Sequence, residues 1–266
     1  MKTRVISAII ALAIVIPLIA YGGTIFDVGV FIIGILALKE FLDIKGTRKK
    51  IPIFIQLISY IFMMLTVLVG IKVTMNSFNF DYKVLSALFL SFLIPTVFYH
   101  ERVTYSVTDA FYLIGGILFI SISISLFILV RKMGIELFIF LLLIPMVTDT
   151  FAYIGGNLIG KDKLLESISP KKTVQGMIIG TIMGSFIGFM YYHTLIDTEF
   201  SKVMLVSICL FLSIIGQLGD LVFSAIKRYF GKKDFSNLIP GHGGILDRLD
   251  SIIFVFLGFM IFINLF

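Results

Sequence analysis

Charged residues are scarce in this chain. Only 14% of its 266 residues are Asp, Glu, Lys or Arg, whereas soluble domains carry about a quarter. Hydrophobic residues make up 59% of the chain, and the mean hydropathy is +1.08. A soluble fold cannot bury that much apolar surface. The composition therefore excludes an ordinary soluble globular protein and predicts a polytopic α-helical membrane protein.

Cysteine is almost absent as well. The single cysteine, Cys209, lies inside an apolar run, so a framework of intrachain disulfides is excluded. The formal net charge of +6 would suggest a nucleic-acid partner in a soluble protein. Aromatic and basic residues are not interleaved here, and the basic cytoplasmic loops of membrane proteins account for the charge. We therefore expect no nucleic-acid partner.

Long apolar runs are abundant and have the length that a membrane requires. A helix of about 20 residues crosses a hydrocarbon core about 30 Å thick. The first run follows Lys2 and Arg4 and also fits a signal peptide cleaved near Ala20. Eight further spans favour a retained helix. We predict an all-α, polytopic transmembrane helical bundle with nine spans, at residues 5–21, 24–42, 51–71, 84–99, 108–130, 135–157, 174–192, 203–226 and 249–266.

The distribution of positive charge predicts the orientation of this bundle. With a cytoplasmic N-terminus, 17 of the 22 lysines and arginines, Arg102 included, fall on the cytoplasmic side, as the positive-inside rule requires. The chain is then a multi-pass protein of the cell (inner) membrane. We divide it into N-terminal helices, middle helices and a C-terminal part with two long cytoplasmic loops: residues 1–82, 83–160 and 161–266.

The eighth predicted span carries a stripe of polar side chains. Spacings of four, three, four and three place them on one helix face. A carboxylate inside a membrane costs on the order of 3 kcal/mol, so it faces a partner or a wet cavity. We favour a functional site. The alternative is an interhelical hydrogen bond, or an ion pair between Asp220 and Lys227, that only holds the bundle together. The stripe consists of Ser213, Gln217, Asp220, Ser224 and Lys227.

Charges also gather where the last predicted span begins. Asp247 and Asp250 are three residues apart, so on a helix they share a face and repel each other unless a cation is near. The helix dipole favours carboxylates there by only a fraction of a kcal/mol. Oxygen ligands from two helices, with positions open for water and phosphate, suit Mg²⁺. Together with Asp220, the pattern indicates a metal site.

The sixth and seventh spans contain two further patterns. In span six, Pro145 predicts a kink, and Asp149 and Tyr153 then lie on one face. Asp149 is a second buried-acid candidate, and packing against Tyr153 is the equal alternative. Span seven has glycine at every fourth position, which allows another helix to approach closely. We interpret these glycines as packing residues: Gly176, Gly180, Gly184 and Gly188.

Two polar loops could bind phosphate. In "KDKLLESISPKKTVQG", Lys171, Lys172 and the free N–H groups at the start of span seven form a candidate phosphate site. The equal alternative is that these lysines only belong to the excess of positive charge that cytoplasmic loops carry. In "GKKDFSNLIPGHGG", backbone amides could close around an oxyanion, and His242 either donates to a phosphate or is an ordinary loop histidine. The glycines of this second loop are Gly241, Gly243 and Gly244.

The segment "SAIKRYFGKKDFSNLIPGHGGILDRLD", residues 224–250, resembles the signature of the phosphatidate cytidylyltransferase family, also called CDP-diacylglycerol synthases. Upstream, residues 149–173 are similar to a second block of that family. Gln175 departs from it, because many members carry glutamate there. The residues that carry the resemblance are Ser224, Lys227, Arg228, Lys233, Asp234, Ser236, His242, Gly243, Gly244, Asp247, Arg248 and Asp250, with Asp149, Tyr153, Gly156, Gly160, Lys163 and "SPKKT" (169–173) upstream.

The resemblance implies a homodimer that converts CTP and phosphatidate to CDP-diacylglycerol and pyrophosphate at the cytoplasmic face. It also implies dependence on Mg²⁺, with K⁺ as a candidate second metal. We assign Asp220 and Asp247 as metal ligands, with Asp250 either as a further ligand or as a group that supports the ligands from behind. Lys227, Arg228 and Arg248 would hold lipid phosphate or pyrophosphate, and His242 with the glycine loop the triphosphate. The other candidate substrate-binding residues are Ser169, Lys171, Lys172, Lys233, Ser224, Asp149 and Tyr153.

Two other functions fit some of these features. Secondary transporters also have intramembrane acids and helices broken by glycine. The halves of this chain show no internal repeat, however, and its polar residues gather near one face instead of the midplane. A CTP-dependent lipid kinase of the polyprenol or dolichol type would use the same nucleotide. It would release CDP instead of pyrophosphate.

Overall fold

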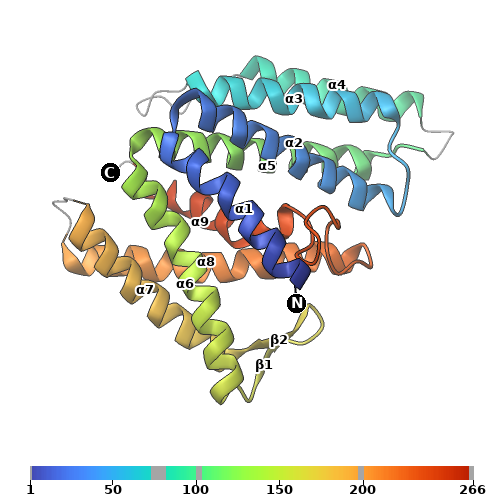
Figure 1. Cartoon of the computed structure of the whole chain (residues 1–266). Coiled ribbons are helices and arrows are strands. Elements are labelled where there is room, and N and C mark those ends of the chain that lie inside the picture. Colours follow the sequence, from blue (N-terminus) through green and yellow to red (C-terminus); the bar gives the residue numbers. More distant parts are fainter. Residues whose placement is uncertain (1, 73–81, 100–103, 197–200, 264–266) are drawn as a thin grey trace. The chain divides into compact units, whose positions relative to one another are not determined.

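The computed structural model describes residues 2–72, 82–99, 104–196 and 201–263, and this part of the chain is almost entirely helical (Figure 1). Arg102 and the end of the ninth predicted span, residues 264–266, lie outside the described residues. The described elements are α1 (Lys2–Tyr21), α2 (Gly23–Gly46), α3 (Ile53–Lys72), α4 (Tyr82–Phe98), α5 (Val107–Met133), α6 (Ile135–Ile159), β1 (Lys163–Leu165), β2 (Ser169–Thr173), α7 (Val174–Leu195), α8 (Lys202–Tyr229) and α9 (Leu246–Phe259).

The all-α prediction is confirmed, and each predicted span coincides with one of these helices. The largest differences are at the ends: α2 continues to Gly46, and α9 begins at Leu246 and ends at Phe259. Among the described residues, four helices are long and apolar enough to cross a membrane by length and composition, namely α5, α6, α7 and α8. Shorter apolar helices lie at Val5–Tyr21, Ile53–Leu68 and Tyr82–Phe98.

The first of the two polar loops predicted from the sequence, residues 161–173, contains a β-hairpin. β1 pairs with β2 in antiparallel register, with Lys163 opposite Thr173. Gln175 fastens the base of the hairpin: its Oε1 accepts from the backbone N–H of Lys161 and of Asp162, and its Nε2 donates to Asp162 Oδ2 over 2.7 Å. A glutamate at position 175 would place a like charge beside Asp162. The amide therefore suits this hairpin.

Contacts within the chain divide it into two compact units. One contains residues 1–132 together with 234–246, and the other contains 133–233 together with 247–266. The residues predicted for the site are divided between them. The three-part division proposed from the sequence concerns function and stays a prediction.

The first unit is built from α1 to α5 and the segment 234–246. Its apolar core contains fully buried side chains such as Phe26, Leu38, Ile55 and Phe92. A buried charged group also joins α2 to α5, because Lys45 and Lys49 both pair with Asp109. The ends of α2 and α5 are thereby tied together by charge as well as by apolar packing.

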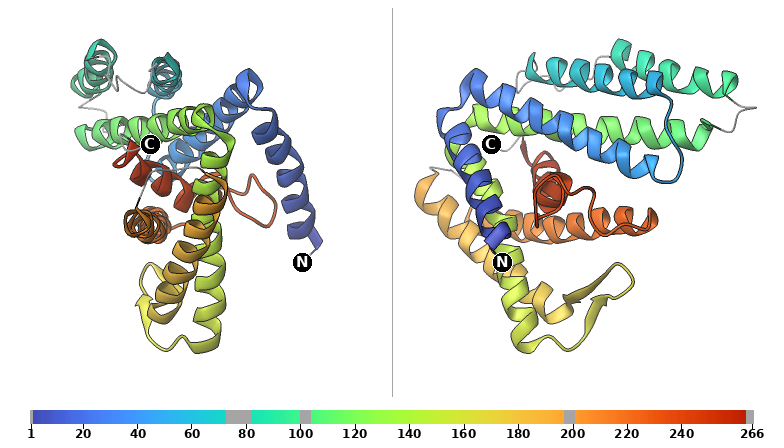
Figure 2. Two further views of the ribbon diagram at one scale, coloured as in Figure 1. Left: turned by 90° about the vertical axis from the view of Figure 1, so that its left-hand side faces the viewer. Right: turned by 45° about the vertical axis from the view of Figure 1, so that its right-hand side comes forward.

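In the second unit, α6 and α7 pack side by side along the glycine stripe (Figure 2). A Cβ atom on Gly176 would lie 2.5 Å from the carbonyl oxygen of Ala152, and one on Gly180 would lie 2.6 Å from that of Thr148. Neither backbone oxygen can move aside cheaply. The prediction that these glycines serve helix packing is confirmed.

This close packing predicts that larger side chains at position 180 prevent assembly of α6 and α7. We expect the Gly180→Val variant to elute mostly as aggregate on size-exclusion chromatography, with only a small monodisperse peak. Its melting temperature should lie well below that of wild type, because overpacking typically costs about 1–3 kcal/mol or more. Gly115→Ala in α5 is the matched control, since nothing lies within 4 Å of a Cβ atom there. A monodisperse Gly180→Val protein with wild-type melting would contradict the close approach.

The polar stripe on α8 divides into two parts. Ser213 hydrogen-bonds with Thr148 of α6 over 2.8 Å, and Gln217 Nε2 donates to Thr181 Oγ1 of α7 over 2.8 Å. These two residues form interhelical hydrogen bonds that hold the bundle together. This is the structural alternative that was considered for the stripe. The other part of the stripe, Asp220 to Lys227, binds different partners.

Candidate active site

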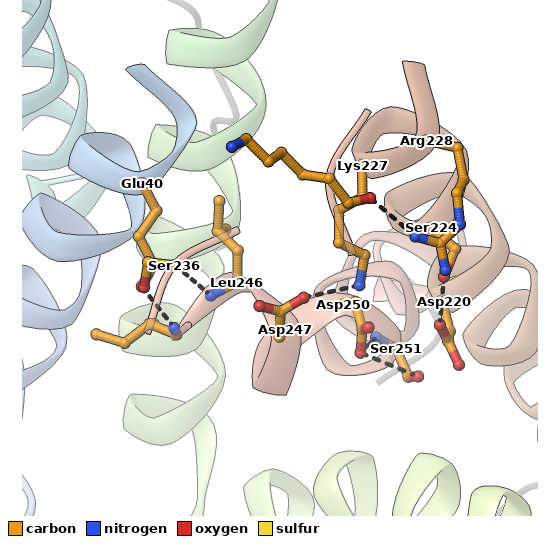
Figure 3. A network of polar contacts seen from close by, with 12 residues as sticks. Glu40, Asp220, Ser224, Lys227, Arg228, Ser236, Leu246, Asp247, Asp250 and Ser251 are labelled. Carbon is orange, nitrogen blue, oxygen red and sulfur yellow. Dashed lines mark hydrogen bonds and ion pairs between the residues drawn. The ribbon is translucent and has the colours of Figure 1, made fainter. Parts of the chain in front are cut away.

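A buried ion pair joins the end of α8 to the start of α9. Lys227 Nζ donates to Asp247 Oδ1 over 2.7 Å, and the two side chains are only 9% and 2% exposed (Figure 3). The two helices can meet there because small residues face α9: a Cβ atom on Gly219 would lie 2.6 Å from Phe254. The expected alternative pair of Lys227 with Asp220 does not form, because Lys227 faces Asp247 instead.

Asp220 pairs with a lysine from the hairpin. Lys172 Nζ on β2 lies 2.6 Å from Asp220 Oδ2, and both side chains are 26% exposed. Ser224 Oγ, one turn further along α8, donates to Asp220 Oδ1 over 3.2 Å. The hairpin therefore brings Lys172, 48 positions away in the sequence, to the polar end of α8.

Two more carboxylates complete this group of charges. Ser251 Oγ donates to Asp149 Oδ2 of α6 over 3.2 Å, and the Ser251 N–H donates to Asp250 Oδ1 over 2.8 Å. Ser251 therefore joins Asp149 of α6 to Asp250 of α9. The two acidic blocks of the sequence therefore meet. Tyr153 is not the partner of Asp149, because its side chain is 72% exposed.

The donor set suits a magnesium ion only if the substrate supplies part of the coordination. Among the described residues, no group of three or more Asp, Glu, His or Cys side chains is arranged to hold a metal. Magnesium, however, usually binds one or two carboxylates together with water and phosphate oxygens. A cation is also favoured beside Asp149 and Asp250, because Ser251 holds these two carboxyl groups close together. The residues present fit such an ion, with Asp220 as one carboxylate.

The other predicted phosphate-binding residues are mostly accessible to solvent. Arg228 donates from Nε to the Ile168 carbonyl and from Nη1 to the Lys232 carbonyl, so it joins α8 to the hairpin. At the start of α7, two of the expected free N–H groups have partners: Val174 N–H donates to the Asp162 carbonyl and Gly176 N–H to Thr173 Oγ1. Exposed candidates are Lys171, Lys233 and Arg248, while Ser169 is half-buried.

The glycine loop belongs to the first unit. The Ile239 N–H donates to the Gly243 carbonyl over 2.8 Å and closes a tight turn. Gly241 and Gly243 have φ of 78° and 87°, a conformation that side chains other than glycine rarely adopt. Ser7 of α1 donates to the Pro240 carbonyl over 3.0 Å and lies 2.8 Å from His242 Nδ1. When Ser7 gives its only hydrogen to Pro240, His242 must donate from Nδ1.

Glu40 of α2 holds the other end of this loop, and sequence reasoning missed it. Its side chain is only 3% exposed. It accepts from Ser236 Oγ over 2.6 Å, from the Ile245 N–H over 2.8 Å and from the Leu246 N–H over 2.9 Å (Figure 3). The available signal was a carboxylate inside the apolar run 24–42, the same signal that identified Asp220.

Comparisons with known proteins agree over the whole chain. A model described as the cytidylyltransferase family matches residues 2–266. A protein of Staphylococcus haemolyticus named phosphatidate cytidylyltransferase is 36% identical over 256 residues, which cover 96% of each chain. Proteins of the same name from Staphylococcus epidermidis and Staphylococcus aureus are 36% and 34% identical, again over 96% of each chain.

Proposed function

The chain belongs to the cytidylyltransferase family, and from this premise we propose that it is a membrane-embedded phosphatidate cytidylyltransferase. The reaction is CTP + phosphatidate → CDP-diacylglycerol + pyrophosphate, a step of phospholipid biosynthesis. Relatives named for this activity match 96% of the chain. The observation that carries the proposal is the position of Asp220 between Lys172 and Ser224, because these two partners belong to the two blocks of the sequence that resemble the family.

The chemistry requires positioning and charge neutralisation more than proton transfer. A phosphatidate oxygen, already an anion, forms a bond to the α-phosphorus of CTP, the bond from that phosphorus to the β-bridging oxygen breaks, and pyrophosphate leaves. No strong general base is needed. The protein has to align the reactants in line and to stabilise the negative charge that collects in the transition state.

The cluster on α8, α9 and β2 supplies groups for these tasks. Lys172 and Lys227 neutralise the carboxylates of Asp220 and Asp247 in the resting protein. Exposed Arg248 directly follows Asp247 on α9, and exposed Lys171 directly precedes Lys172 on β2. Arg228, Arg248 and Lys227 would bind lipid phosphate or pyrophosphate. Asp220 and Asp247 would hold the magnesium ion, with Asp250 beside them and K⁺ as a candidate second metal. When bound, such an ion neutralises phosphate charge and orients the triphosphate.

The proposal includes a topology. Nine spans with a cytoplasmic N-terminus place the hairpin and the glycine loop on the cytoplasmic side of the cell membrane, where CTP is available. Positive charge on that side supports this orientation. A homodimer formed through residues 83–160 belongs to the same proposal.

Product identification tests the reaction directly. Purified protein in detergent with Mg²⁺, CTP labelled at the α-phosphorus and phosphatidate is expected to transfer the label to lipid and to release unlabelled pyrophosphate in equal amounts. Release of labelled CDP with formation of an unlabelled, newly phosphorylated lipid would instead identify a lipid kinase. Activity that requires sealed vesicles, without any covalent product, would identify a transporter.

A further inference from the structure

The segment 234–246 has little regular structure of its own, yet it leads directly to Asp247. Between the end of α8 and the start of α9, it is built from turns and the isolated pairing of Ile239 with Gly243. Three of its thirteen residues are glycines, which contribute no side chain to packing. A loop of this kind keeps one conformation only if other parts of the protein hold it.

Glu40 is the group that holds it. Both oxygens of the buried carboxylate are occupied, and all three donors belong to this one segment: Ser236 Oγ, Ile245 N–H and Leu246 N–H. Within the described part of the chain, Glu40 forms no ion pair with a lysine or arginine. Its burial is therefore compensated by the loop donors alone, and the loop and the carboxylate fix each other.

Gly244 shows that the fit is close. A Cβ atom at this position would lie 2.5 Å from both carboxylate oxygens of Glu40, so any larger residue would displace the carboxylate or the loop. The glycine at position 244 is needed for the approach of Glu40. At the C-terminal end of the loop, the N–H groups of Ile245 and Leu246 both donate to this carboxylate.

We infer that Glu40 is a positioning residue for the proposed cytidylyl transfer: it fixes residues 236–246 and thereby sets the position of His242 within this loop. Leu246, whose N–H it binds, is the first residue of α9 and directly precedes Asp247. Ser7 of α1 supports the same loop at Pro240 and His242. This gives α1 and α2 a role in catalysis. The inference rests on the proposed function, although the contact of Glu40 with the loop does not.

A double-mutant cycle on the full-length protein tests the inference. We expect Glu40→Ala to lower kcat at least about tenfold at saturating CTP and phosphatidate, because small displacements of reacting groups are costly. Gly244→Ala should do the same, since it disturbs the same contact. In the double variant, the second substitution should lower kcat by less than about a further twofold, because either substitution alone already breaks the contact between Glu40 and the loop. Asp43→Ala is the matched control: this carboxylate is exposed on the same helix and should keep wild-type kcat.

Hydrogen–deuterium exchange supplies a readout that does not depend on activity. Glu40→Ala should speed exchange in the peptide containing Ile245 and Leu246 and leave α7 unchanged. Glu40→Gln, which keeps one acceptor oxygen, should be intermediate in both measurements, and it replaces Glu40→Ala if that variant does not fold. Wild-type kcat with unchanged exchange, or multiplicative effects in the double variant, would overturn the inference. If wild-type protein makes no CDP-diacylglycerol, the proposed function fails while the exchange result still tests the contact.

Discussion

Asp247→Asn is expected to remove nearly all turnover, by at least about 100-fold, while the protein still inserts and folds. A carboxylate that holds a metal ion against phosphate contributes several kcal/mol to the transition state, and each 1.4 kcal/mol is about a factor of ten in rate. Asparagine keeps an oxygen near Lys227 Nζ but loses the charge. Excess Mg²⁺ should therefore restore little activity. Wild-type turnover would remove Asp247 from the metal site.

The buried pair with Lys227 makes a second variant necessary. Breaking a buried ion pair on one side destabilises a protein by about 3–5 kcal/mol, so reduced turnover could reflect lost folding. Lys227→Met combined with Asp247→Asn removes both charges. We expect the melting temperature of this double variant to recover toward wild type and its turnover to stay low. Recovery of turnover together with stability would show that the pair is only structural.

The helices were predictable because their signal is local. An apolar run must leave water wherever it lies in the chain, so hydropathy locates each helix without knowledge of its neighbours. Strand pairing is not local in this sense. The hairpin at 163–173 has exposed lysines and a proline at position 170, and no alternation of apolar residues marks it as a sheet. The hairpin is recognised only in the structure, where its two strands pair beside α7 and Gln175 hydrogen-bonds to its first residues.

The site was predicted at the level of residues but not of partners. Buried acids such as Asp149 and Asp220 stand out in any apolar run, because their burial requires compensation. Spacing along one helix offered an ion pair between Lys227 and Asp220 only as the structural alternative to a functional site. In the structure Lys227 faces Asp247, and Asp220 takes Lys172, because helix spacing carries no information about segments that arrive from elsewhere. The donors to Glu40 could not be predicted for the same reason, since they lie about 200 positions away, although its carboxylate inside an apolar run was a visible signal.

Lys172→Ala is expected to cost far more activity than loss of the other lysines on the hairpin. Without Lys172, the negative charge of the Asp220 carboxylate is no longer compensated by its ion pair. An incoming phosphate then meets more negative charge. We expect kcat/KM to fall roughly 10- to 100-fold, which corresponds to about 1.4–2.7 kcal/mol at the transition state.

Two neighbouring lysines make this prediction specific. Lys161→Ala removes the same charge from the exposed base of the hairpin and should stay within about twofold of wild type, because exposed charges are screened by salt. Lys171→Ala should raise the apparent KM for CTP or phosphatidate with little change in kcat, as expected for a residue that binds substrate equally in the ground and transition states. Equal losses in all three variants would mean that the hairpin contributes only general positive charge. A loss confined to Lys172→Ala and Lys171→Ala, in kcat/KM and in KM respectively, would assign the hairpin to the active site.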